Sequence, residues 1–225
     1  MKLRKSLVIG GKQYNLVEDD VRLELNTSGR ALFRVQSPRV LCGIVQFRLG
    51  YSSQNKDQLF FTGYIESSHT VDAATQKIFC REMAAALSFK LPISLRHLTL
   101  RDVLRAYTDK TDLAFIVPEQ PYADRRIPHF HTLGSGYHGM DQLGAVFGIE
   151  DYFWQPQPDG SVFVGSWNHS RWATRPVDIE EKFFTGVTGT GAKVLPAIPA
   201  LRAGVLLNGQ RVNSLQLCGH EMVVG

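Results

Sequence analysis

The chain has 225 residues and a mass of 25.2 kDa, with 44% hydrophobic and 20% charged residues. A chain of this length buries about two-thirds to three-quarters of its unfolded surface, so we expect a packed core in one large or two small domains. The ordinary composition excludes disorder, collagen and coiled coil. The longest apolar runs have five residues, too few to cross a bilayer, and we expect no membrane insertion.

The net charge of +4 is unevenly distributed along the chain. Residues 1–110 carry 17 Lys and Arg against 10 Asp and Glu, whereas residues 111–225 carry 8 against 11. A basic half would suit nucleic acid or an acidic partner, but the chain lacks the alternating aromatic and basic residues that stack bases. Scattered solvated charges are the simpler interpretation.

Cysteine spacing and the N-terminus bear on the cellular compartment. Cys42, Cys80 and Cys218 are widely spaced and predict neither a disulfide framework nor a zinc ribbon. The apolar stretch at residues 7–9 is too short for a secretory signal, so we expect no signal peptide.

The first eighty residues have the pattern of short β-strands. Gly10-Gly11 separates two short strand-like stretches, as in a tight hairpin. Apolar residues then alternate with polar ones at Val21, Leu23 and Leu25, at Ala31, Phe33 and Val35, and at Val45, Phe47 and Leu49. Residues 59–65 are rich in Phe and Tyr. Five or six such strands predict a barrel or sandwich.

The middle of the chain changes to helices and strands. Thr99 followed by Asp102 predicts a helix start, and the apolar residues after it recur with helical spacing through Tyr107. Residues 113–117 form a candidate buried strand. A second unit of the same kind follows, with Ser135 as its helix cap, a strand at 152–154 and another at 162–164.

The last part returns to β-type spacing, with Asn208-Gly209 predicting a hairpin and Gly219 separating two short apolar stretches. We therefore predict an α+β fold, mainly antiparallel β. Two β-modules, residues 1–95 and 167–225, flank a small α/β segment of two helix–strand units at residues 96–166.

Three histidines are the candidates for a metal site. His129 and His131 would share one face of a strand, and His138 could complete a three-histidine zinc site. No carboxylate stands at a recognisable ligand spacing, however, and His-x-His pairs are common. Surface or packing histidines are the simpler interpretation, and we expect no metal and no cofactor.

No motif in the sequence requires catalysis. Ser135 and Ser166 follow glycines without forming a G-x-S-x-G elbow, and the glycine-rich stretch at 186–191 lacks the strand and helix of a dinucleotide loop. Adjacent acids at 150–151 and 180–181 would point to opposite faces of a strand. We expect no catalytic residue.

Two tryptophans carry an alternative interpretation. Trp167 and Trp172 flank the polar stretch 168–171 and could form an exposed aromatic surface for an interface or a sugar. Core packing is the competing interpretation. The alternative function is thus a carbohydrate- or peptide-binding β-domain.

Eight segments within residues 59–225 carry a family resemblance, namely 100–107, 112–117, 139–149, 152–154, 159–164, 198–205, 207–211 and 219–222. They resemble the baseplate hub proteins of phage tails, a family that includes the late control protein of temperate contractile-tailed phages and the base of the type VI secretion spike.

The resemblance implies two tail-tube-like β-barrels joined by an α/β region, with three copies closing into a ring that matches the sixfold tail tube. It implies as partners the chain itself as a homotrimer, the tail tube or distal tail protein, the central spike protein and the tape measure protein. Nucleic acid would be passing cargo only, and the location would be the virion tail, assembled in the host cytoplasm. The chain has no β-helical repeat or lysozyme-like insertion. The expected function is therefore a structural adaptor without catalysis.

Overall fold

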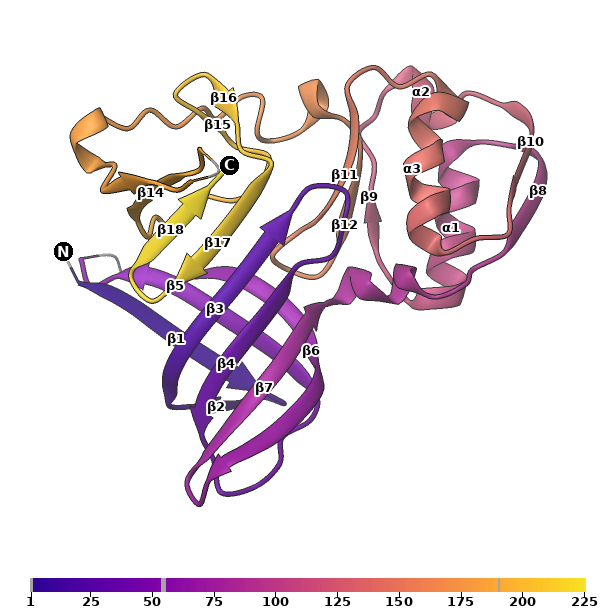
Figure 1. The fold of residues 1–225 in the computed structure, drawn as a ribbon. Helices are drawn as coiled ribbons and strands as arrows, with labels where there is room; N and C mark the ends of the chain where they lie inside the picture. Colours follow the sequence, from indigo (N-terminus) through magenta and orange to yellow (C-terminus); the bar gives the residue numbers. More distant parts are fainter. Residues whose placement is uncertain (1, 54–55, 190) are drawn as a thin grey trace. The chain divides into compact units, whose positions relative to one another are not determined.

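The computed structural model describes residues 2–53, 56–189 and 191–225. They divide into two compact units, coloured along the sequence in Figure 1. Unit 1 comprises Met1–Glu24, Gly29–Glu82 and Pro176–Gly225, and unit 2 comprises Leu25–Ser28 and Met83–Arg175. The predicted fold class is confirmed, because antiparallel strands dominate and the helices gather in the middle of the chain.

Unit 1 is built on one antiparallel sheet of eleven strands in the order β13-β14-β18-β17-β3-β4-β7-β6-β5-β1-β2. The strands are β1 (Leu3–Ile9), β2 (Lys12–Tyr14), β3 (Leu16–Glu24), β4 (Arg30–Gln36), β5 (Ile44–Tyr51), β6 (Gln58–Asp72), β7 (Thr75–Glu82), β13 (Gly186–Val187), β14 (Lys193–Pro196), β17 (Ser214–Cys218) and β18 (Glu221–Val224). The hairpin of β15 (Leu206–Leu207) and β16 (Gln210–Arg211) and a 3₁₀ helix, Glu181–Phe183, complete the unit.

The turns of this sheet follow the predicted glycines. Gly10 and Gly11 have φ of 55° and 83°, the left-handed conformation that a two-residue turn between β1 and β2 requires. Asn208 and Gly209, at 47° and 78°, do the same between β15 and β16. Both predicted hairpins are confirmed.

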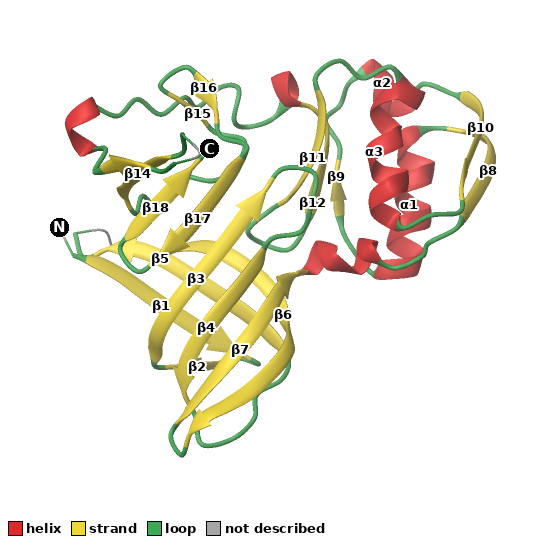
Figure 2. Cartoon of the chain, in the orientation of Figure 1, coloured by secondary structure: helices red, strands yellow, loops and turns green. Residues whose placement is uncertain are grey.

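The sheet curls around an aromatic core. Phe33 of β4 and Phe47 of β5 have ring centroids 5.1 Å apart, although β7 and β6 separate their strands in the sheet. Phe61 and Phe60 pack edge-on against these two rings. The residues of β3, β4 and β5 predicted to face inward are buried in this core. Leu25, which the same pattern predicted to face inward, follows β3 and is only half-buried. Figure 2 shows the strands wrapping around this interior.

The C-terminal strands extend this same sheet, whereas the sequence pattern predicts residues 167–225 as a module separate from residues 1–95. The reason is a long-range pairing, because β17 lies beside β3 with Leu217 opposite Val21. β18 and β14 then follow β17 outward. The first and last parts of the chain thus form one unit, and the long stretch of unit 2 is Met83–Arg175 in place of the predicted 96–166.

Unit 2 packs three helices beside two small sheets. The helices are α1 (Leu100–Thr111), α2 (Pro121–Asp124) and α3 (Gly136–Phe147). The strands are β8 (Ile93–Leu98), β9 (Phe115–Ile116), β10 (Ile127–Thr132), β11 (Tyr152–Pro156) and β12 (Val162–Ser166), with 3₁₀ helices at Met83–Ser88 and Trp167–His169. β10 pairs with β8, and β12 lies between β11 and β9.

Both predicted helix caps are confirmed. The Thr99 hydroxyl accepts the Asp102 backbone N–H, and the Asp102 carboxylate accepts the Thr99 backbone N–H at 2.9 Å, which is a capping box. Ser135 accepts the His138 N–H at 3.3 Å at the start of α3. None of the helices formed by residues 2–53, 56–189 and 191–225 combines the length and apolar character needed to cross a membrane.

Candidate functional site

An ion pair bridges two strands that are not hydrogen-bonded neighbours in the sheet. The Lys5 ammonium of β1 lies 2.6 Å from the Asp19 carboxylate of β3 and also donates to the Gly219 carbonyl after β17. Both side chains are largely buried, with 13% and 5% of their surfaces exposed. β1 and β3 are therefore joined by side chains at the place where the curled sheet brings them together.

The position of Asp19 affects its protonation. Burial raises the pKa of Asp19, although the hydrogen bond and charge of Lys5 and the charge of His220 act in the opposite direction. Hollows of about 410 and 510 Å³ lie beside it, and both include Asp19 in their lining. Protonation of Asp19 would remove the negative charge that Lys5 binds at this junction.

A second buried pair joins the C-terminal segment to the first strands. Arg202 Nη2 lies 3.2 Å from Glu82 Oε1, with 4% and 3% of the two side chains exposed. The second Glu82 oxygen accepts the Gly29 N–H at 2.6 Å, and Arg202 Nη1 donates to the Phe60 carbonyl. Burial raises the pKa of Glu82 and the Arg202 charge opposes this rise. Arg202 therefore fixes the segment after β14 against the core of unit 1.

The sheet of unit 1 ends in two exposed edge strands. Among the strands of the described residues, β2 has a neighbour only in β1, and β13 has a neighbour only in β14. Val187 of β13 is one of the most exposed large hydrophobic side chains, with 68% of its surface exposed. Exposed strand edges are surfaces on which another strand can pair. These edges are the features most suited to assembly.

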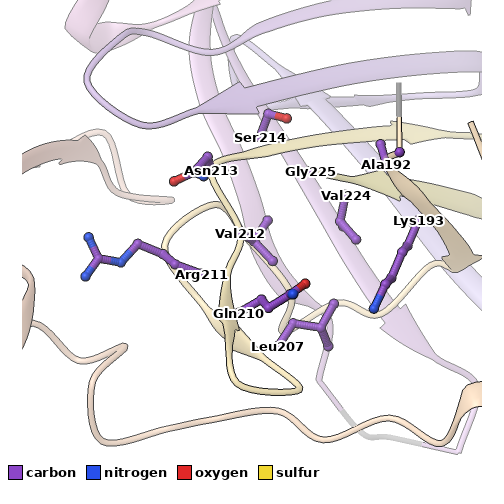
Figure 3. A pocket seen from close by; sticks show the side chains of 11 residues that line it. Ala192, Lys193, Leu207, Gln210, Arg211, Val212, Asn213, Ser214, Val224 and Gly225 are labelled. Carbon is purple, nitrogen blue, oxygen red and sulfur yellow. The ribbon is translucent and has the colours of Figure 1, made fainter. Parts of the chain in front are cut away.

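A hollow of about 480 Å³ lies between β14, β18 and the β15–β16 hairpin (Figure 3). Lys193 and Gln210 extend over it, whereas Arg211 points away. The Lys193 ammonium lies 5.1 Å from the centroid of the Phe184 ring. The remaining lining residues in the described part of the chain are small, apolar or amide side chains and backbone. This lining does not form an acid–base pair or an activated nucleophile.

The three candidate histidines of the sequence lie on two elements of unit 2. His129 and His131 are exposed on the outward face of β10, opposite Arg96 and Ser94 of β8. His138 lies on α3, where its Nε2 is 2.9 Å from the amide nitrogen of Gln142. Within residues 2–53, 56–189 and 191–225, no group of three or more His, Cys, Asp or Glu side chains could hold a metal ion.

The two candidate tryptophans are buried, which agrees with the core-packing interpretation and not with an exposed aromatic surface. Trp167 and Trp172 have 9% and 6% of their surfaces exposed. Trp172 Nε1 donates to the Gln155 side chain at 2.7 Å, and the Arg171 guanidinium covers its ring at 4.1 Å. A polar partner for the indole N–H and a cationic cover allow this ring to be buried within a polar stretch. Trp167 and Trp172 therefore do not provide the exposed aromatic surface that the alternative of a carbohydrate- or peptide-binding domain requires.

A phage protein is similar to this chain in sequence. No protein-family model matches the chain. A 58.7 kDa protein in the lys 3′ region of Haemophilus phage HP1 is 34% identical over 226 residues, which cover all of this chain. The chain spans 42% of the length of that relative.

Solved structures share the fold at low sequence identity. The 43 kDa tail protein of prophage MuSo2 from Shewanella oneidensis is 10% identical, with a TM-score of 0.72 and coverage of 99% of this chain and 96% of that one. The tail protein from Neisseria meningitidis MC58 is also 10% identical, with a TM-score of 0.73 and coverage of 100% and 96%.

The E. coli c3393 protein, a type VI secretion component with structural similarity to the T4 tail proteins gp27 and gp5, has a TM-score of 0.60 at 11% identity. The matched region covers 97% of this chain and 75% of the E. coli protein. The chain has the fold of phage tail proteins, and the resemblance drawn from its sequence is confirmed at the level of the fold.

Proposed function

We propose that the protein is a structural adaptor in the tail of a phage or of a related injection machine. In this proposal three copies form a ring that joins the tail tube, or the distal tail protein, to the central spike, next to the tape measure protein. The adaptor performs no catalysis, does not insert into a membrane, and meets nucleic acid only as cargo in transit. It is located in the virion tail.

The observation that carries this proposal is the fold likeness to tail proteins, which covers nearly the whole of both chains at TM-scores of 0.72 and 0.73. The relation to the phage HP1 protein supports a phage origin for the sequence. The sheet supports assembly for a physical reason, since its two ends are exposed edges that a ring of copies would cover.

Three measurements test the proposal. Light scattering of the purified chain should give three times the 25.2 kDa monomer mass, and electron microscopy should show threefold rings. Labelled antibodies should bind tail particles at the end that carries the spike. A protein that stays monomeric at high concentration and is absent from the particles would overturn the proposal.

A further inference from the structure

The two edge strands of the unit 1 sheet, β2 and β13, each present backbone groups to which another strand could bind. The first end is β2, where Lys12 and Gln13 are exposed and a hollow of about 510 Å³ lies beside Gln13 and Tyr14. The two-residue turn makes Ile9 and Lys12 the closing hydrogen-bonded pair of the hairpin. In an antiparallel ladder the next pair, Val8 and Gln13, turns its backbone groups away from the partner strand. The N–H and C=O of Gln13 therefore point outward from the sheet.

The second end is β13, and the same reasoning selects Val187. The Thr188 N–H donates to the Ala192 carbonyl at 2.8 Å, which identifies these two residues as a hydrogen-bonded pair. Val187 stands opposite Lys193, one position along, so its N–H and C=O point away from β14. Its side chain is also exposed, as is that of Phe183 nearby. An edge with apolar side chains and outward backbone groups is a surface for strand addition.

The charges next to the two edges have opposite signs. Lys12 is the charged residue of β2, and its ammonium lies 5.6 Å from the Tyr14 ring centroid, along the edge strand. Of the other basic residues before it, Lys5 is paired with Asp19 and Arg4 with Asp57. Residues 178–189 contain Asp178, Glu180 and Glu181 against Lys182, which itself binds Glu180 at 2.6 Å. Opposite charges attract the two edges and disfavour pairing of like with like.

We propose that the β2 edge of one copy pairs with the β13 edge of a second copy, with the backbone groups of Gln13 and Val187 at the centre of the contact. The proposal rests on the ring assembly proposed above and assigns its contact surface. The partner at each edge is another copy of this chain, because one chain carries both the β2 edge and the complementary β13 edge. A contact between two different surfaces leaves each copy with one free edge, so that assembly continues until a ring closes.

Proline substitutions provide the direct test. Gln13→Pro and Val187→Pro each remove an outward N–H without removing a hydrogen bond inside the chain, and proline is tolerated on edge strands. The matched controls are Gln13→Thr and Val187→Thr, which keep the N–H and suit a strand. Circular dichroism checks that every variant remains folded.

The variants are expected to differ from their controls in mass. Each proline variant alone should be monomeric, with a dissociation constant raised at least tenfold, whereas the threonine controls should form the same oligomer as the original chain. An equimolar mixture of the two proline variants should give a dimer of twice 25.2 kDa and nothing larger, because each retains one intact edge. If a β2 or a β13 edge paired with its own kind, one variant alone would still dimerise, which would overturn the proposal.

Cross-linking keeps the test independent of the folding of the proline variants. Gln13→Cys and Val187→Cys are placed on separate chains in a background of Cys42→Ser and Cys218→Ser, which removes the exposed thiols. Directly opposite residues in an antiparallel pair lie within disulfide range, so oxidation of the mixture should give a covalent dimer. If the mixture gives no disulfide and both proline variants still form the normal oligomer, the edge contact is overturned and the proposed function is unaffected. A monomeric original chain that is absent from tails would instead overturn the proposed function.

Discussion

Removing Arg202 tests the account of how unit 1 is held together. The change Arg202→Met keeps an apolar side chain of similar length over the Phe60 ring, which the guanidinium now covers at 5.4 Å. It leaves the Glu82 carboxylate buried without its cation. Breaking a buried ion pair from one side destabilises proteins by about 3–5 kcal/mol. Because the Gly29 N–H still binds Glu82, we expect the lower end, about 3 kcal/mol.

The same variant should change the dependence of stability on pH. Burial raises the pKa of Glu82 above its ordinary value of 4.5, so the native protein holds this proton more tightly than the unfolded chain does. The free energy of unfolding therefore falls as the pH rises from 4.5 through the raised native pKa. Arg202 opposes the rise in pKa, and its removal should make this fall larger and extend it to higher pH.

Urea unfolding followed by circular dichroism measures both effects. The three tryptophans lie in unit 2, so their fluorescence follows that unit separately. The double variant Arg202→Met, Glu82→Gln is the matched control, because the amide oxygen can still accept the Gly29 N–H without a buried charge. It should recover to within about 1–2 kcal/mol of the original chain. A single variant that loses less than about 1 kcal/mol, or a double variant less stable than the single one, would refute the reasoning.

Three further predictions concern other contacts. Burial raises the pKa of Asp19 beside Lys5, so the contribution of Asp19 to the free energy of unfolding falls as the pH rises from 3.8 through the native pKa. Asp19→Asn should abolish this fall in urea titrations across that pH range. An unchanged dependence of stability on pH in the variant would contradict this prediction. Thr99→Ala should destabilise unit 2 by about 1 kcal/mol, measured by tryptophan fluorescence in urea, because it removes the cap of α1; a change near zero would show that the cap is dispensable. Gly63→Ala should lower the free energy of unfolding by about 1–3 kcal/mol by circular dichroism, because the added methyl group would overlap the Arg81 carbonyl oxygen; unchanged stability would exclude this overlap.

The sequence predicted the elements whose signals are local. Alternation located the inward faces of β3, β4 and β5, and paired turn residues located the hairpins at Gly10 and Asn208. The capping pair Thr99 and Asp102 located α1. Each of these signals lies within a few residues of the structure that it specifies, so a single sequence is sufficient to find it.

The contacts that define unit 1 could not be predicted in this way. Asp19 lies two residues before Val21 and Glu82 two residues after Cys80, so each faces the same buried side of its strand. The alternation therefore places a charged residue at a buried position in both strands. This is a signal that a partner must exist, because an unpaired buried charge is strongly unfavourable. The partner of Glu82 is 120 residues away, and no periodicity carries that information.

The buried pairs and the pairing of β17 with β3 have one consequence in common, which is that unit 1 needs both parts of the chain that surround unit 2. Lys5 reaches the Gly219 carbonyl, Glu82 binds Arg202, and β17 covers the outer edge of β3. Contacts at such large separation form slowly, because loop closure must precede them. Most of unit 2 is the continuous stretch Met83–Arg175, whose helices and hairpins form from local contacts. Until residues 202–218 arrive, the strands of unit 1 retain a buried carboxylate without its cation and an open edge at β3. Loop-closure entropy therefore predicts that these long-range contacts of unit 1 form after the local helices and hairpins of unit 2.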